Sequence, residues 1–272
     1  MKDRILLFIP AYNCEKQIIR VLGQLDRDIM KYIERVIVTD NRSTDSTGEV
    51  VSSFIKMHGD LPVVLLRNRE NYGLGGSHKV AFQYAIDGGF DYVMVLHGDD
   101  QGFIHDFIPV LSHKIYRKHD AVLGARFMRE SRLKGYSALR TFGNIVYDFL
   151  FAFVVRKKIY DLGSGLNIYS VESLKSGYYM KFPDNLMFNY AMILASEYYA
   201  QDICFYPISW REDDQASNVK LVSQAVKVLR MLFGYYHDPL TITQDYRDKR
   251  IDRYEAEEVI MSRMLMEPDG TG

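Results

Sequence analysis

The first 125 residues alternate between short apolar runs and longer segments in which apolar and polar residues mix. The apolar runs are rich in Val, Ile and Leu and predict strands at residues 5–9, 36–39, 63–66, 92–96 and 121–123. Segments long enough for helices separate them, at residues 14–32, 46–58, 76–87 and 103–118. This alternation is typical of βαβ units, so we predict an α/β fold with a mostly parallel sheet flanked by helices.

The second half of the chain is less regular. It predicts helices at residues 136–155, 186–201 and 219–236, strands at 166–169 and 203–208, and a charged loop at 210–218. The residues from 246 onward are highly charged and predict a helix with a frayed end. We therefore expect one domain over residues 1–236 and a C-terminal helical extension over residues 237–272.

Polar and flexible residues follow each predicted strand of the first half, at residues 10–13, 40–45, 68–76, 97–102 and 124–126. Right-handed crossovers place the loops after parallel strands along one edge of the sheet. Ligands of open α/β sheets bind at that edge. These loops are therefore expected to form one ligand site.

The most informative loop reads HGDDQG at residues 97–102 and directly follows the strand at 92–96. Carboxylate and amide oxygens at the end of a buried strand suit Mg²⁺ or Mn²⁺. A cation held there neutralises a diphosphate, which points to a nucleotide-sugar donor. The alternative is an acidic turn that caps the following helix.

Two further loops suit a nucleotide. Asp40 directly follows a predicted strand, where its carboxylate can accept a hydrogen bond from a nucleobase or a ribose hydroxyl. The glycines of NYGLGG, residues 71–76, allow a ligand to approach the backbone closely. The first strand–helix turn has no glycine and no GxxxxGK[ST] occurs, so a Rossmann dehydrogenase and a P-loop enzyme are both poor interpretations.

Three arginines and one aspartate are the remaining candidates. Arg126, Arg140 and Arg211 offer the planar paired donors that suit phosphate oxygens, although each is also explained as a solvated surface residue. Asp161 precedes the glycine turn LGSG, residues 162–165. A carboxylate there can act as a general base or position an acceptor, or it can simply form an Asx turn.

Composition constrains the partners and the cellular location of the protein. The chain has 272 residues, a formal net charge of −1 and two cysteines, Cys14 and Cys204, that fit no metal or disulfide pattern. Balanced charge gives no sign of a nucleic-acid partner, and the cysteine usage favours a reduced, cytoplasmic location. The N-terminus lacks the features of a signal peptide.

No uninterrupted apolar stretch reaches the roughly 18 residues of a membrane-spanning helix. Residues 142–155 and 219–236 combine apolar faces with flanking Lys and Arg. This pattern predicts peripheral contact with a membrane surface, at the cytoplasmic face. Packing into the core or into a dimer is the alternative.

Seven segments in a fixed order make the chain resemble the family 2 glycosyltransferases of the GT-A fold, in particular the dolichyl-phosphate mannose synthase-like and bacterial polyprenyl-phosphate branch. They are IPAYNCE (9–15), VIVTDNRSTDST (36–47), NYGLGGSHKVAFQYA (71–85), VLHGDDQG (95–102), GAR (124–126), DLGSGL (161–166) and WREDDQASNVK (210–220). The resemblance spans about residues 4–235. It implies that residues 1–125 bind a nucleotide sugar and that residues 126–236 bind the acceptor.

The resemblance also implies roles for single residues. On the donor side these are Pro10, Ala11, Tyr12, Glu15, Asp40, Asn71 and Gly73, with Asp40 reading the base. Asp99 and Gln101 are implied ligands of Mg²⁺ or Mn²⁺ on the donor diphosphate. The family often reads Asp-x-Asp-x-Gln here, and His97 stands at the first position, so whether His97 contacts the metal stays open.

On the acceptor side, Arg126, Arg140 and Arg211 match phosphate-binding positions. Arg126, Arg211 and Asp161 are the catalytic candidates, and Ser164, Ser217 and Lys220 are expected to contact substrate. The usual glycine of the loop is replaced by Gln215-Ala216.

The implied activity is inverting transfer of a sugar from a UDP- or GDP-linked donor. The implied acceptor is a polyprenyl phosphate or a glycan in cell-surface polysaccharide or glycolipid synthesis. Asp161 orients an acceptor that is already a phosphate anion, whereas it is the base candidate for a sugar hydroxyl. The alternatives are a non-catalytic nucleotide-sugar-binding scaffold and a sugar nucleotidyltransferase, whose glycine- and lysine-rich first loop is missing here. Pairing through the C-terminal helices would give a homo-oligomer.

Overall fold

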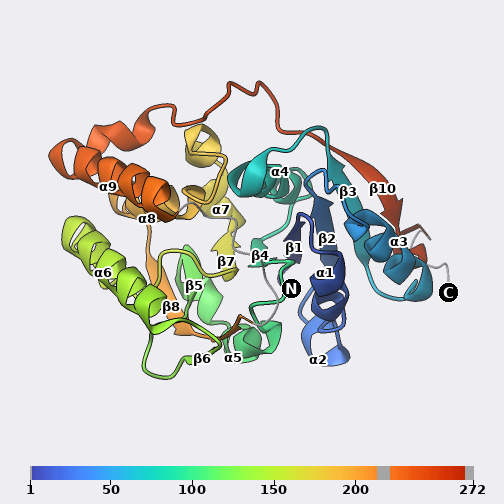
Figure 1. The fold of residues 1–272 in the computed structure, drawn as a ribbon. Helices are drawn as coiled ribbons and strands as arrows, with labels where there is room; N and C mark the ends of the chain where they lie inside the picture. The colour runs from blue at the N-terminus through green and yellow to red at the C-terminus, as the bar shows by residue number, and fades with distance from the viewer. Residues whose placement is uncertain (1, 213–220, 267–272) are drawn as a thin grey trace.

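An eight-stranded sheet forms the centre of the protein, whose computed structural model describes residues 2–212 and 221–266 (Figure 1). The strand order is β10-β3-β2-β1-β4-β7-β5-β8. The strands are β1 (Ile5–Ala11), β2 (Arg35–Asp40), β3 (Val63–Asn68), β4 (Tyr92–Leu96), β5 (Ala121–Ala125), β7 (Leu166–Ser170), β8 (Ile203–Pro207) and β10 (Ala256–Met261). Strands β3-β2-β1-β4 are mutually parallel and β5 is parallel to β8, as the βαβ pattern predicted.

Helices cover both faces because side chains alternate along each strand. In β1, Ile5, Leu7 and Ile9 face one core, while Leu6 and Phe8 face the other. The first core lies under α1 (Glu15–Leu22), α2 (Arg27–Met30), α3 (Thr47–Met57), η1 (Ile104–Phe107), α5 (Ile108–Ser112) and η2 (Ile115–Lys118). The second lies under α4 (Gly73–Asp87), α6 (Ala138–Val155), α7 (Val171–Leu174), η3 (Tyr178–Lys181), α8 (Phe188–Tyr198), α9 (Leu221–His237) and η4 (Pro239–Thr243).

Strand β7 runs antiparallel between β4 and β5. Its first residues therefore lie beside the last residues of β4, and the His97 N–H donates to the Gly165 carbonyl at 2.9 Å. This reversed strand carries residues 161–165 to the edge of the sheet where the parallel strands end. A small second sheet pairs β6 (Arg132–Lys134) with β9 (Ser209–Arg211), which was predicted as loop.

The predicted C-terminal helix is wrong. Residues Ala256–Met261 form β10, which pairs antiparallel with β3 and completes the sheet, followed by the short helix α10 (Arg263–Met266). An unpaired β3 would leave a row of backbone donors and acceptors at the sheet edge, and pairing with the tail satisfies them. The fully buried Lys79 holds the residues just before β10 in place. Its ammonium contacts Asp184 at 2.7 Å and the Tyr254 hydroxyl at 3.2 Å.

Helix α6 (Ala138–Val155) corresponds to the helix predicted at residues 136–155 and extends beyond the apolar stretch at residues 142–155. It begins at Ala138 and, by length and composition alone, is long and apolar enough to cross a membrane. One side of it packs against the protein, with Phe151 and Val155 in the core under α8. The opposite side is exposed.

Candidate functional site

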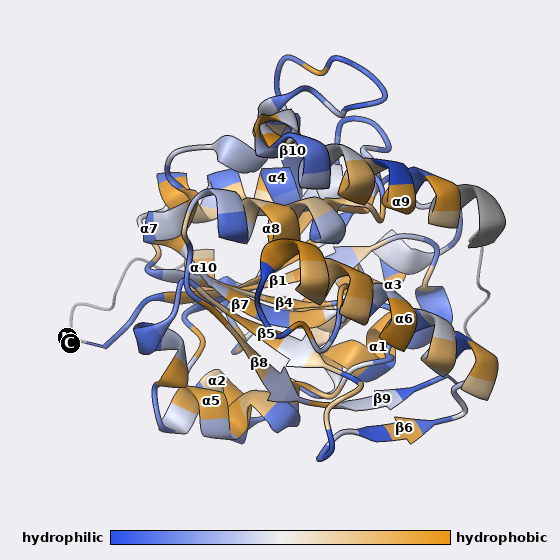
Figure 2. Cartoon of the chain, turned by 90° about the vertical axis from the view of Figure 1, so that its left-hand side faces the viewer, coloured by the Kyte–Doolittle hydropathy of each residue, from blue (hydrophilic) through white to orange (hydrophobic). Residues whose placement is uncertain are grey.

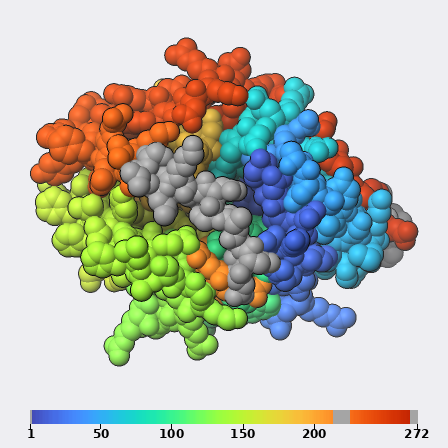
Figure 3. All heavy atoms as spheres, viewed as in Figure 1, coloured from blue at the N-terminus to red at the C-terminus, as the bar shows by residue number. Residues whose placement is uncertain are grey.

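One cavity of about 1070 Å³ opens at the carboxyl edge of the sheet. Tyr12, Asn13, Glu15 and Asp45 line its first end. Its middle is formed by His97, Asp99, Gln101, Arg126 and Arg140, and its far end by apolar residues of α6 and α9, among them Leu139, Tyr147, Val226 and Leu229. In Figure 3 the surfaces of α6 and α9 lie side by side at one end of the molecule, opposite the N-terminal segments. The convergence of loops predicted from the sequence is therefore present.

The first end is built from the loop after β1 and the start of α1. Pro10 and Ala11 end the buried strand, and Ala11 is in register with Asp40 of β2. Tyr12 is half-exposed over the cavity, and the Glu15 carboxylate accepts the Ser46 N–H at 3.0 Å. This hydrogen bond ties the start of α1 to the start of α3.

Asp40, Asn71 and Gly73 lie behind this end and do not line the cavity. The buried Asp40 carboxylate accepts the Ser43 N–H at 2.8 Å and pairs with Arg67 at 3.3 Å. Asn71 accepts the Gly73 N–H at 3.0 Å. Gly73 has a φ of +70°, and a Cβ there would lie 2.4 Å from the Asp184 carbonyl oxygen. Each of the three thus shapes its loop.

Asp99 and Gln101 both line the cavity, on either side of Asp100, whose backbone is left-handed with a φ of +59°. Burial raises the pKa of Asp99 to about 6. Such a carboxylate gains from a neighbouring cation. Within residues 2–212 and 221–266 no group of three or more His, Cys, Asp or Glu residues is arranged around a metal position. The pair of oxygen donors nevertheless fits Mg²⁺ or Mn²⁺, which commonly use one or two carboxylates together with substrate phosphates and water.

His97 lines the cavity beside these ligands. Burial, reinforced by the charge of Arg126, lowers the pKa of His97 to about 4, so its ring is neutral near pH 7. Its buried Nε2 has no hydrogen-bond partner in the described residues. Gly165 is required behind the ring, since a Cβ there would lie 2.6 Å from it.

Arg126 and Asp161 form a buried ion pair at the end of β5. Arg126 Nε donates to Asp161 Oδ2 at 2.7 Å and Nη2 to Oδ1 at 2.8 Å. The Arg126 and Gly163 backbone N–H groups each donate to the same carboxylate at 2.9 Å. Burial opposes the charge on Arg126, but the adjacent Asp161 outweighs it and raises the pKa of the guanidinium. The four donors occupy both carboxylate oxygens, which favours an orienting role for Asp161.

The other two arginines are also paired. Arg140 lines the cavity from α6 and donates to Glu212 at 2.6 Å. Arg211 does not line the cavity, because its guanidinium turns toward Asp100. Ser217 and Lys220 lie outside the described residues.

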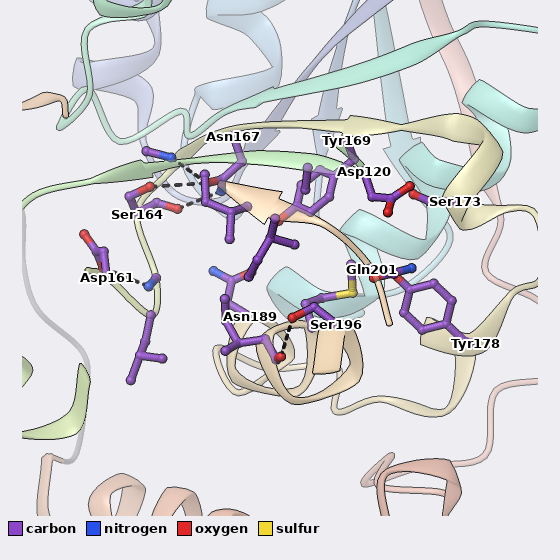
Figure 4. A pocket seen from close by; sticks show the side chains of 18 residues that line it. Asp120, Asp161, Ser164, Asn167, Tyr169, Ser173, Tyr178, Asn189, Ser196 and Gln201 are labelled. Atoms are coloured by element: carbon purple, nitrogen blue, oxygen red, sulfur yellow. Dashed lines mark hydrogen bonds between the residues drawn. The ribbon is translucent and has the colours of Figure 1, made fainter. Parts of the chain in front are cut away.

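Ser164 faces a second, small cavity behind the turn (Figure 4). This cavity has about 20 Å³, the space of a single water molecule. The Ser164 hydroxyl donates to Asn167 at 3.3 Å, and Asn189 Oδ1 is buried without a partner in the described part of the chain. Ser164 therefore supports the turn from behind rather than facing the main cavity.

Sequence reasoning missed several cavity residues, namely Tyr136, Asn144, Tyr147, Asn189, Tyr190, Trp210 and Glu212. Arg126 packs over the rings of Tyr136 and Trp210, and Asn144 donates to the Tyr136 hydroxyl at 2.7 Å. A signal for Asn144 exists in the sequence. Arg140, Asn144 and Asp148 are spaced by four residues, so they form a polar stripe along one side of the apolar α6.

Comparisons with known proteins identify the family of the chain. The model of the family described as "Glycosyl transferase family 2" matches residues 7–177. The chain is 24% identical over 186 residues to UDP-N-acetylglucosamine--dolichyl-phosphate N-acetylglucosaminyltransferase of Methanococcus voltae, covering 64% of this chain and 73% of that one. It is 25% identical over 173 residues to undecaprenyl-phosphate mannosyltransferase of Micrococcus luteus, covering 64% and 69%.

Among solved structures, glucosyl-3-phosphoglycerate synthase from Mycobacterium tuberculosis, in complex with UDP, has a TM-score of 0.61 at 15% identity and covers 97% of this chain and 92% of that one. The same enzyme with Mn²⁺, UDP and glucosyl-3-phosphoglycerate has a TM-score of 0.59 at 14% identity, with coverage of 97% and 92%. At these identities the likeness shows the fold.

The structure is thus an α/β fold with a GT-A-type sheet and, at the carboxyl edge, a cavity lined by Arg126 and Arg140. The chain belongs to glycosyl transferase family 2. The predicted family, fold class and glycosyltransferase activity are confirmed.

Proposed function

We propose that the protein transfers a sugar, with inversion, from a UDP- or GDP-linked donor to a polyprenyl phosphate. The observation that carries this proposal is that one continuous cavity, of about 1070 Å³, joins the loop after β1, the Asp99 and Gln101 side chains and the apolar residues of α6 and α9. A donor nucleotide fits the first end and an isoprenoid chain fits the apolar end. The two ends meet at Arg126 and Arg140. The relatives named for dolichyl and undecaprenyl phosphate support this choice of acceptor.

Each group has a chemical task in this proposal. Asp99 and Gln101 would hold Mg²⁺ or Mn²⁺, and the bound cation would supply positive charge to neutralise the leaving diphosphate. Arg126 and Arg140 bind the acceptor phosphate, whose oxygen is already anionic and needs no strong base. Asp161 keeps the Arg126 guanidinium in a fixed orientation through its two-oxygen contact. These oriented charges lower the barrier by electrostatic stabilisation.

The acceptor is tested by incubating the protein with Mn²⁺ and radiolabelled donors, UDP- and GDP-linked in turn, and extracting lipid product. The acceptors are a short polyprenyl phosphate and, in parallel, a sugar with a free hydroxyl. Metal-dependent label in the polyprenyl phosphate is the expected result. Label only in the free sugar refutes the lipid acceptor, and donor that stays intact throughout favours the non-catalytic scaffold.

A peripheral contact with the membrane belongs to the same proposal. The outward face of α6 carries Phe142, Phe149 and Phe153, and α9 adds Phe233, each between 65% and 70% exposed. Figure 2 shows apolar positions of both helices turned toward the viewer. Arg156, Lys157 and Lys158 follow α6, so this face suits an anionic lipid surface. It borders the apolar end of the cavity, where a lipid-borne acceptor would enter.

Flotation with vesicles of anionic lipid tests the contact. The wild-type protein is expected to float, and a variant with Phe149→Ser and Phe233→Ser is expected to stay in the soluble fraction. Equal flotation of both contradicts the membrane contact. Size-exclusion chromatography of the same pair tests the alternative that this face joins two copies of the chain.

A further inference from the structure

Asp100 stands between the two proposed metal ligands and points away from the cavity. Its backbone is left-handed, with a φ of +59°, a region that residues other than glycine rarely adopt. Its side chain is only 1% exposed.

Two guanidinium groups from distant elements meet on this carboxylate. Arg20 of α1 donates its Nε to Asp100 Oδ2 at 2.5 Å. Arg211 of β9 pairs with the same oxygen through Nη2 and donates its Nε to the Asp100 backbone carbonyl at 2.9 Å. The Arg211 N–H also donates to the Gln101 carbonyl at 3.0 Å.

Arg20 and Arg211 together hold residues 100–101 in place. Arg211 donates to the backbone carbonyls of both Asp100 and Gln101, and its guanidinium lies 5.0 Å over the ring of Phe103. Arg20 links the same carboxylate to α1, which begins in the donor loop at Glu15. The left-handed residue is thereby kept in the conformation that turns Asp99 and Gln101 into the cavity.

We propose that Asp100 is a positioning residue for the divalent cation, acting through Arg20 and Arg211 to fix the directions of Asp99 and Gln101. This inference rests on the proposed function, because it assumes a cation at those two side chains. Residues that orient metal ligands without touching the metal commonly change its affinity 10- to 100-fold when they are replaced. A buried ion pair with only a structural role would leave that affinity unchanged.

The test compares Asp100→Asn with the wild-type protein. Asparagine keeps the shape and also tolerates a left-handed backbone, but it lacks the charge that holds two guanidinium groups together. The dissociation constant of Mn²⁺ is measured by calorimetry in the presence of UDP or GDP, whichever stabilises the wild-type protein. The dissociation constant of that nucleotide is then measured without metal. We expect about tenfold weaker Mn²⁺ binding, with metal-free nucleotide binding changed less than about twofold.

Asp3→Asn is the matched control. Asp3 also accepts from two partners, Arg117 at 2.8 Å and the Tyr116 hydroxyl at 2.6 Å, but it precedes β1 at the opposite edge of the sheet. Its Mn²⁺ affinity should equal that of the wild type. Arg20→Gln removes one of the two partners from a half-exposed position and should weaken Mn²⁺ binding several-fold, even if Asp100→Asn does not fold.

The outcomes separate the two proposals. If the wild-type protein binds neither Mn²⁺ nor a nucleotide, the proposed function fails and this inference fails with it. If the wild type binds Mn²⁺ and the folded Asp100 and Arg20 variants bind it equally well, the positioning role is overturned and the proposed function stands. An equal loss in Asp3→Asn also overturns it, because the effect is then a general loss of stability.

Discussion

Replacing Asp161 by asparagine distinguishes an orienting carboxylate from a general base. The side chain of Asp161 is fully buried and that of Arg126 is 11% exposed, and the two share two direct hydrogen bonds. Asparagine keeps the shape but turns one acceptor oxygen into a donor that faces another donor. Asp161→Asn therefore leaves a buried guanidinium without its counter-charge.

The expected loss of stability follows from the burial of this ion pair. Removing one partner of a buried ion pair lowers the free energy of unfolding by about 3–5 kcal/mol. For a chain of this size that corresponds to a fall in Tm of roughly 10 °C. Because Asp161 also accepts two backbone N–H groups, the upper half of the range is the better expectation.

Urea unfolding of four proteins measures the effect: wild type, Asp161→Asn, Arg126→Gln and the double variant. The double variant has no orphaned charge, so its loss should be smaller than the sum of the single losses by about 2 kcal/mol. Transfer activity should fall in both single variants without a change in its pH profile. An Asp161→Asn protein that keeps its stability, loses all transfer and loses a basic limb of the pH profile would refute the orienting role.

Three further predictions concern Asp148, Lys79 and His97. Burial, with a contribution from nearby Asp161, raises the pKa of Asp148 to about 8, whereas its pKa in the unfolded chain is near 3.8. Between these two pH values the folded state holds a proton that the unfolded state lacks. Stability should therefore fall as pH rises through this window. In urea unfolding, Asp148→Asn should remove this fall in the free energy of unfolding between pH 5 and 8. It should also stabilise the protein at pH 7 by as much as about 4 kcal/mol. A free energy of unfolding that still falls with pH in the variant contradicts the assignment to Asp148. Lys79→Met leaves Asp184 without its cation and should lower the free energy of unfolding by about 3 kcal/mol, whereas an unchanged denaturation midpoint would show that the pair contributes nothing. His97→Asp puts a second carboxylate beside Asp99 and should tighten Mn²⁺ binding in the presence of UDP or GDP; weaker binding would instead identify the imidazole as a ligand.

The sheet up to β5 was predictable from the sequence because local pattern and burial agree there. Buried parallel strands are continuous apolar runs, and the helices between them are long enough for a crossover. The position of the loops after these strands was likewise predictable, since the end of a parallel strand fixes where its loop lies. The i, i+4 spacing of Arg140, Asn144 and Asp148 was available as well, and it marks the inward side of α6.

The C-terminal strand was not predictable in this way. Residues 256–261 carry charged side chains that suit a solvated helix, and the strand forms because the edge of β3 offers hydrogen bonds to a segment far along the chain. The same holds for Ser164, which a motif places on the acceptor side but which the reversed direction of β7 turns toward a small rear cavity.

The amino-acid sequence by itself determined the α/β class, the family and the edge of the sheet at which the large cavity opens, because each depends on local periodicity or on motifs in a fixed order. Only the tertiary structure decided how the charges are paired. Arg126 meets Asp161, Arg140 meets Glu212, and Arg211 turns from the cavity to Asp100. These partners are brought together by strand order and by β9, and no property of one segment specifies which acid a distant arginine will reach.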